Sequence, residues 1–152
     1  MKPMLVISVH PDDETLGSGG FLLKHKAHGN DIYWCIITSI NESIGFSRED
    51  VAKRSLEIEE VSNCYGFSRV VELNFPSMHL DRVGRAEIVQ AISQAIRSIE
   101  PAILILPFCH DIHSDHRIAF ECAYSCTKSF RYPYIKRVLM METLSETEFS
   151  VP

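Results

Sequence analysis

Five short apolar runs, separated by stretches with helical periodicity, set the strongest limit on how this sequence can fold. Because strands that alternate with helices form a parallel sheet covered on both faces, the pattern predicts an α/β, Rossmann-like doubly wound domain with a mainly parallel sheet. Right-handed crossovers leave few topologies, and we expect the strand order 3-2-1-4-5. The expected strands lie at residues 4–9, 32–38, 70–75, 102–107 and 136–141, and the expected helices at about 15–28, 48–65, 82–99 and 116–127.

The length and composition are those of one ordinary globular domain. The 152 residues are 45% hydrophobic and 23% charged, with no linker or internal repeat, so we expect residues 1–152 to form a single domain. No apolar run approaches the roughly 20 residues of a membrane span, and the N-terminus lacks the basic-then-apolar pattern of a secretory signal. We therefore expect no membrane span and a cytoplasmic location.

Net charge and cysteine content narrow the classes of partner. The formal net charge is −5, and the basic residues do not gather in one stripe, which argues against nucleic acid as a partner. The cysteines are odd in number and lie mostly in strand-like or helix-like segments, so we expect buried free thiols rather than disulfides or a cysteine-based metal site. They are Cys35, Cys64, Cys109, Cys122 and Cys126.

Two polar clusters follow the expected first and fourth strands. "HPDDE", residues 10–14, comes directly after the first strand, and "HDIHSDH", residues 110–116, comes shortly after the fourth. In a doubly wound sheet the ligand crevice lies beyond the carboxyl ends of the strands where the winding changes direction, which here are these two. The fold would bring the clusters face to face, and a cation would relieve the repulsion among their acids. The irregular stretches 39–48 and 76–82 are expected loops that could flank this pocket.

The side-chain types in these clusters favour zinc. Imidazole with carboxylate suits that ion, and a catalytic zinc site has three protein ligands and one open position. Asp12 and Asp13 are adjacent on a turn and must point in different directions, so one can bind the metal while the other acts as general base. His113 and His116, three residues apart at a helix start, can likewise divide between the metal and the reacting carbonyl. Spacing alone leaves open which member of each pair does which.

The two motifs together resemble a known family. "HPDDE" after the first strand and "HSDH", residues 113–116, after the fourth look like the signature of the LmbE-like, or PIG-L, zinc-dependent N-deacetylases. The middle of the chain, "RSLEIEEVSNCYGFSRVVELNFPSMHLD" at residues 54–81, is similar to the family's Arg-x-x-Glu helix, glycine and following strand. The resemblance implies a hydrolase that removes an acetyl group from an N-acetylated amino sugar or sugar conjugate. It also implies one zinc, or a similar divalent ion, per chain.

Carried over residue by residue, the resemblance assigns roles within the two clusters. It implies that the metal is held by His10, Asp13 and His116. It further implies that Asp12 is the general base on the attacking water, and that His113 stabilises the oxyanion or protonates the leaving amine. Asp115 would then orient His113.

Other polar side chains have a structural alternative beside the functional one. Arg54 could hold a sugar or phosphate oxygen, or form a surface ion pair with an acid one helical turn away. His79, in an expected loop, is a candidate substrate contact. His110 and Asp111 begin the second cluster and are expected to support its ligands. Glu14 begins a helix, where an acid is stabilised by the helix dipole with or without a site nearby.

Two other interpretations of the chain compete with a deacetylase. A dinucleotide loop built on Gly17, Gly19 and Gly20 would need its glycines directly after the strand, where three acids would repel a pyrophosphate. A truncated metal-binding module with a structural or regulatory role is the stronger alternative. Family members usually continue well beyond the point corresponding to residues 141–142, so we expect this chain to lack the family's C-terminal part. An uncovered sheet edge is compatible with a homo-oligomer.

Overall fold

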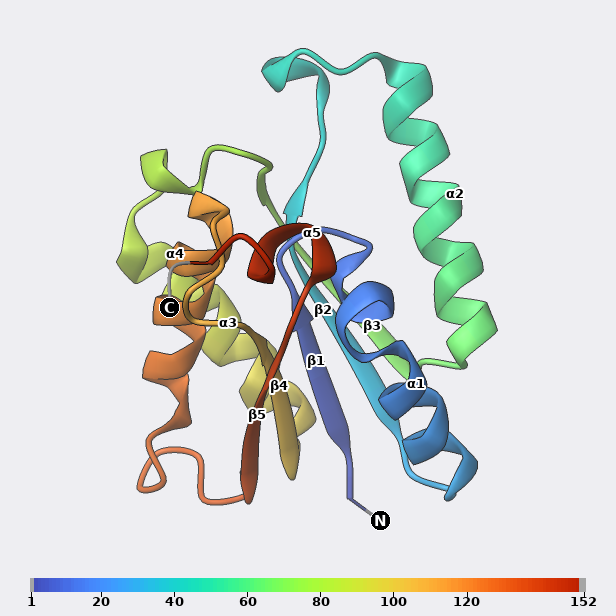
Figure 1. Ribbon diagram of the computed structural model, residues 1–152, viewed down its shortest axis with the longest axis vertical. Coiled ribbons are helices and arrows are strands. Elements are labelled where there is room, and N and C mark those ends of the chain that lie inside the picture. Colours follow the sequence, from blue (N-terminus) through green and yellow to red (C-terminus); the bar gives the residue numbers. More distant parts are fainter. Residues whose placement is uncertain (1, 151–152) are drawn as a thin grey trace.

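The protein is built on one sheet of five parallel strands, and its computed structural model describes residues 2–150 (Figure 1). The strands are β1 (Met4–Ser8), β2 (Ile32–Ser39), β3 (Arg69–Pro76), β4 (Ile103–Pro107) and β5 (Arg137–Met141). Their order is β3-β2-β1-β4-β5, and every neighbouring pair is parallel. The expected α/β fold and strand order are therefore confirmed, with β1 at the centre of the sheet.

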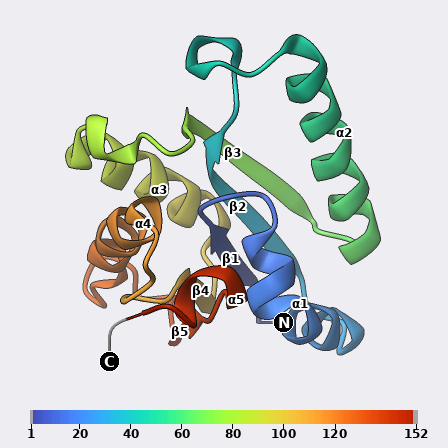
Figure 2. The same ribbon diagram turned by 45° about the horizontal axis from the view of Figure 1, so that its top comes forward.

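Helices cover both faces of the sheet. α1 (Asp13–Ala27) and α2 (Arg48–Tyr65) lie on one face, and α3 (Arg85–Ile99) and α4 (Ser114–Tyr124) lie on the other (Figures 1 and 2). These are the four predicted helices, with ends shifted by a few residues. A short helix, α5 (Leu144–Thr147), and three 3₁₀ turns were not predicted. The 3₁₀ turns are η1 (Glu42–Ile44), η2 (Leu80–Arg82) and η3 (Ser125–Thr127).

Alternating side chains of the central strand divide the core into two layers. Leu5 and Ile7 belong to the cluster beneath α3 and α4, whereas Met4 and Val6 belong to the cluster beneath α1 and α2. All four side chains are fully buried, and burial of a side chain of this size contributes about 1.5–3 kcal/mol to folding. β1 is therefore held firmly on both faces, which fixes the position of the residues that follow it.

The cysteines are free thiols, as expected. Cys35, Cys122 and Cys126 are buried in the core, and burial raises the pKa of Cys35 to about 12, so this thiol stays protonated. Cys64 is exposed and Cys109 is half-buried, which differs from the expectation of general burial. Cys64 is exposed because it lies near the end of α2, a helix whose residues are all at least partly exposed.

The edges of the sheet are more open than its centre. Most residues of β3 and β5 are partly or fully exposed, whereas every residue of β1 and β4 is buried. α2 crosses beside the β3 edge and begins with a capping box between Ser47 and Asp50. Within residues 2–150, each helix is too short or too polar to cross a bilayer.

Two glycines of α1 allow other segments to approach this helix closely. A Cβ atom at Gly19 would lie 2.6 Å from the Tyr65 hydroxyl oxygen of α2. A Cβ atom at Gly17 would lie 2.9 Å from the carbonyl oxygen of Glu142, just after β5. The glycines therefore serve helix packing. This use, together with the acids that precede them, argues against the dinucleotide-loop interpretation.

Candidate active site

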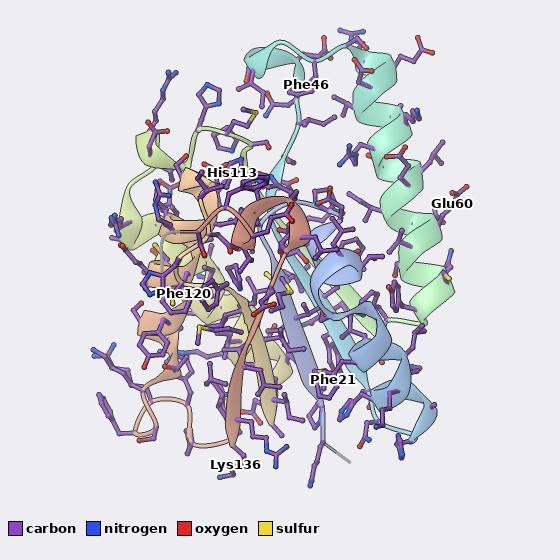
Figure 3. All side chains as sticks on the ribbon, in the orientation of Figure 1. Phe21, Phe46, Glu60, His113, Phe120 and Lys136 are labelled. Atoms are coloured by element: carbon purple, nitrogen blue, oxygen red, sulfur yellow. The ribbon has the colours of Figure 1, made fainter. Side chains whose placement is uncertain are left out.

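A pocket of about 590 Å³ lies at the carboxyl ends of the strands. His10, Asp12 and Asp13 reach it from the junction of β1 and α1, and His113 and His116 reach it from the start of α4. The ring centroids of the three histidines lie 4.9 to 5.5 Å apart. Figure 3 shows His113 at this end of the sheet, close to the short helix α5. The two polar clusters predicted to face each other thus share one pocket.

His10 presents an unprotonated ring nitrogen to the pocket. The Thr38 hydroxyl donates its hydrogen to the Val9 carbonyl oxygen at 2.7 Å, which leaves it to accept one from His10 Nδ1 at 2.9 Å, and the Ser77 hydroxyl oxygen lies 3.2 Å from the same nitrogen. The neutral ring therefore has a lone pair at Nε2, which is buried and has no hydrogen-bond partner among the described residues. Burial, and then the nearby charges of His116, His113 and Arg54, lower the pKa of His10 to about 3. A neutral imidazole whose free lone pair is buried in the pocket fits a metal ligand.

His116, like His10, donates a hydrogen bond from Nδ1, but its acceptor is a carboxylate. Its Nδ1 donates to Asp111 Oδ2 at 2.9 Å, so the neutral ring turns Nε2 toward Asp13 Oδ2, which lies 3.5 Å away. The histidine and both aspartates are almost fully buried. Burial opposes a charge on the ring, but the Asp111 hydrogen bond and the negative charge of Asp13 outweigh it and raise the pKa of His116. Positive charge is thus favoured between these side chains.

Asp13 is fixed by the backbone that precedes it. Its Oδ2 atom accepts the backbone N–H groups of Val9 and His10, each at 2.9 Å. Burial raises the pKa of Asp13 to about 6, against the opposing effects of His116 and of the two backbone hydrogen bonds. A carboxylate that is this buried is costly unless a cation stands beside it.

The neutral His113 ring carries its hydrogen on the opposite nitrogen from His10 and His116. It is the N-cap residue of α4, and its Nδ1 accepts the backbone N–H of Asp115 at 3.1 Å. A nitrogen that accepts cannot carry the hydrogen, so the neutral His113 ring carries it at Nε2. His10 and His116 therefore offer lone pairs to the pocket, whereas His113 is a hydrogen-bond donor at Nε2.

The Asp115 carboxylate does not orient His113 as expected. Its two oxygens accept the backbone N–H groups of Met78 at 2.7 Å and of Leu80 at 3.1 Å. Met78 has a positive φ of 62°, so the carboxylate holds a loop in a backbone conformation that non-glycine residues rarely adopt. The expected orientation comes instead from the backbone N–H of Asp115. The side chain positions the loop before α3.

The arrangement fits a divalent metal, and two ligand sets share His10. Donor atoms of His10, His113 and Asp115 all lie within 4.8 Å of one another. However, both oxygens of Asp115 and Nδ1 of His113 are engaged by backbone N–H groups. In the set predicted from the sequence, His10 offers a buried, unpartnered Nε2, and the Nε2 of His116 lies 3.5 Å from Asp13 Oδ2, which likewise accepts two backbone N–H groups. This set stays a prediction. Nitrogen and carboxylate donors of this kind suit zinc.

Asp12 lies at the mouth of the pocket with its carboxylate available. It is the N-cap residue of α1, a position where an aspartate usually accepts a backbone hydrogen bond. Its side chain makes no capping hydrogen bond within the described part of the chain. The residue is exposed and lines the pocket, so its carboxylate can meet a substrate or a water molecule there.

The predicted substrate contacts divide. Arg54 lines the pocket and also forms the alternative ion pair, with Glu57 at 3.1 Å. His79 is not among the described residues that line the pocket, and its Nδ1 is hydrogen-bonded to the Ser77 carbonyl oxygen at 2.8 Å. Asp111 contacts a pocket histidine, as expected, but His110 is exposed and packs edge-on against a neighbouring phenylalanine.

Glu14 belongs to a separate buried network beneath the site. Its carboxylate accepts hydrogen bonds from Ser8 at 3.3 Å and from Thr15 at 2.6 Å. Ser8 in turn accepts the Trp34 indole N–H, and Thr15 accepts the Tyr65 hydroxyl. Burial raises the pKa of Glu14. These contacts join the start of α1 to β1, β2 and α2, which is a structural role.

Several pocket residues were not singled out from the sequence. Thr38 orients His10, and its place at the end of β2, next to β1 in the predicted order, is a signal that could have identified it. Phe46 and Met78 come from the two expected loops, which do line the pocket. Glu146 also lines it, from α5, a segment without any recognisable pattern.

Known proteins are similar to this chain in both sequence and fold. The family model described as PIG-L, GlcNAc-PI de-N-acetylase, matches residues 5–127. The diacetylchitobiose deacetylase of Thermococcus kodakarensis is 31% identical over 126 residues, which cover 78% of this chain and 46% of that protein. The chain thus spans about half the length of this curated relative.

Solved structures agree with the sequence match. The conserved protein TT1542 from Thermus thermophilus superposes with a TM-score of 0.74 at 27% identity, covering 93% of this chain and 66% of that one. The N,N'-diacetylchitobiose deacetylase from Pyrococcus horikoshii superposes with a TM-score of 0.73 at 25% identity, covering 89% of this chain and 52% of that one. Both similarities extend over most of the sheet and its helices.

Proposed function

The chain belongs to the PIG-L family of GlcNAc-PI de-N-acetylases, and from this premise we propose that it is a metal-dependent N-deacetylase. Its substrate is an N-acetylated amino sugar or sugar conjugate, and its products are acetate and the free amine. The names of two relatives, both deacetylases of diacetylchitobiose, support this class of substrate. A pocket of about 590 Å³ has room for a sugar of this kind.

The observation that carries the proposal is the division of three histidines by their hydrogen bonds. His10 and His116 each use Nδ1 as a donor, which leaves a lone pair at Nε2 for a metal ion. His113 uses Nδ1 as an acceptor, which leaves an N–H at Nε2 for an oxygen of the substrate. An amide hydrolase needs both kinds of group side by side.

A divalent ion such as zinc, held by His10, Asp13 and His116, would act as a Lewis acid and lower the pKa of water toward about 7. Asp12 serves as the general base and takes a proton from the attacking water as its oxygen bonds to the carbonyl carbon. His113 donates a hydrogen bond from its Nε2–H group to the carbonyl oxygen while negative charge develops there, and it keeps its hydrogen. The proton held by Asp12 passes to the nitrogen as the C–N bond breaks, which releases the amine and acetic acid.

Acetate release from a panel of acetamido sugars tests the proposal. The panel contains N-acetylglucosamine, diacetylchitobiose and an acetylated sugar-inositol, each assayed with added zinc and with a chelator. We expect zinc-dependent acetate release from at least one of them, and its loss in Asp12→Asn. A folded chain that binds zinc and releases no acetate from the panel would favour the alternative, a non-catalytic metal-binding module.

A further inference from the structure

The segment after β5 contacts the site although the proposed mechanism does not use it. Its helix α5 lies between the α1 side and the α4 side of the molecule, at the carboxyl ends of the strands (Figures 1 and 2). The Thr147 hydroxyl donates to Asp111 Oδ1 at 2.5 Å. The other oxygen of the same carboxylate accepts the Nδ1 hydrogen of His116 at 2.9 Å. A continuous chain of hydrogen bonds therefore runs from α5 to a proposed metal ligand.

Because these side chains are buried, the loss of any one of these hydrogen bonds would be costly. Asp111 is fully buried and His116 is 1% exposed, so water cannot replace a lost partner without rearrangement. A buried carboxylate that loses one of its donors keeps the desolvation cost of that oxygen, and it can rotate away from the other donor. Within residues 2–150, the side-chain donors to Asp111 are His116 and Thr147.

The turn itself fixes the direction of the Thr147 hydroxyl. Thr147 Oγ1 accepts the backbone N–H of Thr143 at 2.8 Å, so its single hydrogen is left to point at Asp111. The Thr143 carbonyl oxygen in turn accepts the backbone N–H groups of Glu146 and Thr147 at 2.8 and 2.7 Å. The hydroxyl is thus held in place before any metal binds, which reduces the cost of ordering the site.

We propose that Thr147 is a positioning residue, which sets the orientation of His116 toward the metal by holding Asp111. The inference rests on the proposed function, since it takes His116 as a metal ligand. Partners of metal-binding histidines tune both ring orientation and affinity. The match to the family model ends at residue 127, so Thr147 lies outside that match, whereas Asp111 and His116 lie inside it.

Zinc affinity of the full chain, measured by competition with a chelator, tests the role of the hydroxyl. Thr147→Val keeps the side-chain shape and should weaken zinc binding about 10-fold, the lower end of the range for partners of metal ligands. Thr147→Ser keeps the hydroxyl and should remain within about twofold of the parent chain. Thr143→Val is the matched control, because Thr143 is buried in the same turn and its hydroxyl has no hydrogen-bond partner among the described residues.

A double variant tests whether Thr147 acts through Asp111. Asp111→Asn alone should weaken zinc binding about 10- to 100-fold. Adding Thr147→Val should then weaken it little further, because two changes along one hydrogen-bond chain are not additive. Additive losses would show that Thr147 acts by another route and would overturn the inference.

The exchange rate of the His116 Nδ1 hydrogen, followed by NMR in metal-free protein, is a readout that needs no metal. We expect faster exchange in Thr147→Val and an unchanged rate in Thr143→Val. Unchanged zinc affinity and unchanged exchange in folded Thr147→Val would overturn the inference, and Thr147→Ala carries the same test if the valine variant does not fold. A parent chain that binds no zinc would contradict the proposed function, and the exchange rate would still decide the role of Thr147.

Discussion

The two walls of the pocket differ in burial and in how their side chains are held. On the wall built by the ends of β1 and β4 and the starts of α1 and α4, Asp13, Asp115 and His116 are at most 2% exposed, and each is fixed by hydrogen bonds to backbone or to another buried side chain. On the wall built by α2 and the loop after β2, the Arg54 side chain is 39% exposed and Phe46 is 38% exposed. Figure 3 shows Phe46 and His113 on separate segments at this end of the molecule.

The difference follows from the position of each wall in the sheet. β1 and β4 are central and buried along their whole length, so the residues after them start from a rigid support. α2 lies beside the edge strand β3, and all of its residues are at least partly exposed. We infer that the buried wall fixes the chemistry, whereas the open wall meets the variable part of the substrate.

The largest expected effect is on metal binding by the buried wall. His116→Ala should weaken zinc affinity more than about 100-fold, because it removes a ligand. Loss of a residue that only supports a ligand costs at most about 100-fold. Metal content and chelator competition measure this. His79→Ala is the control, since His79 is not among the described residues that line the pocket. Unchanged zinc binding in folded His116→Ala would shift the site to His10, His113 and Asp115.

The next largest effect is a loss of turnover at the boundary of the two walls, where Asp12 is exposed and Asp13 is buried. Asp12→Asn should keep its metal and lose ~10²- to 10⁴-fold in turnover, the usual range for a general base. Asp13→Asn should instead weaken metal binding. Turnover and metal content measured on the same samples separate the two roles, and equal metal loss in both variants would contradict the assignment.

His113 tests whether the buried wall contains a donor as well as ligands. His113→Ala should retain zinc and lose ~10²- to 10³-fold in kcat, as for the removal of one oxyanion donor. KM should change little, because the interaction strengthens only as charge develops on the oxygen. Loss of zinc from this variant would place His113 among the ligands.

The smallest expected effect is on the open wall. Arg54→Ala should raise KM about 10-fold, as for the loss of one hydrogen bond from a charged group, and should leave zinc affinity unchanged. Lys53→Ala is the matched control, because Lys53 is exposed on the same helix and pairs weakly with the same Glu57. A fall in kcat with an unchanged KM would assign Arg54 to the chemistry and remove the contrast between the walls.

The buried wall could be predicted from the sequence because its information is local. The runs that form β1 and β4 are apolar throughout, and "HPDDE" and "HSDH" follow them in the chain. Once the strand order is known, geometry alone places His10 and His116 in one pocket. The family assignment, which rested on the same short motifs, is confirmed by a match over residues 5–127.

Contacts between distant segments could not be predicted in the same way. Asp115 was expected to orient His113, but its carboxylate bonds to the backbone at Met78 and Leu80, and the path of that loop has no signature in the sequence. α5 has only four residues, too few to show a helical period, so the sequence gives no sign that Thr147 lies near the site. Its importance depends entirely on Asp111, which precedes it by 36 residues.

Gly17 lies where α1 contacts the end of β5, shortly before α5 begins. A methyl group there would press on the Glu142 carbonyl at 2.9 Å and on the Met141 side chain at 3.0 Å, so we expect Gly17→Ala to push α1 and the end of β5 apart. α5 begins two residues after Glu142 and would be carried along, whereas Asp111 is anchored elsewhere. The absence of a side chain at Gly17 thus influences the distance between the Thr147 hydroxyl and the Asp111 carboxylate, although Gly17 contacts neither residue.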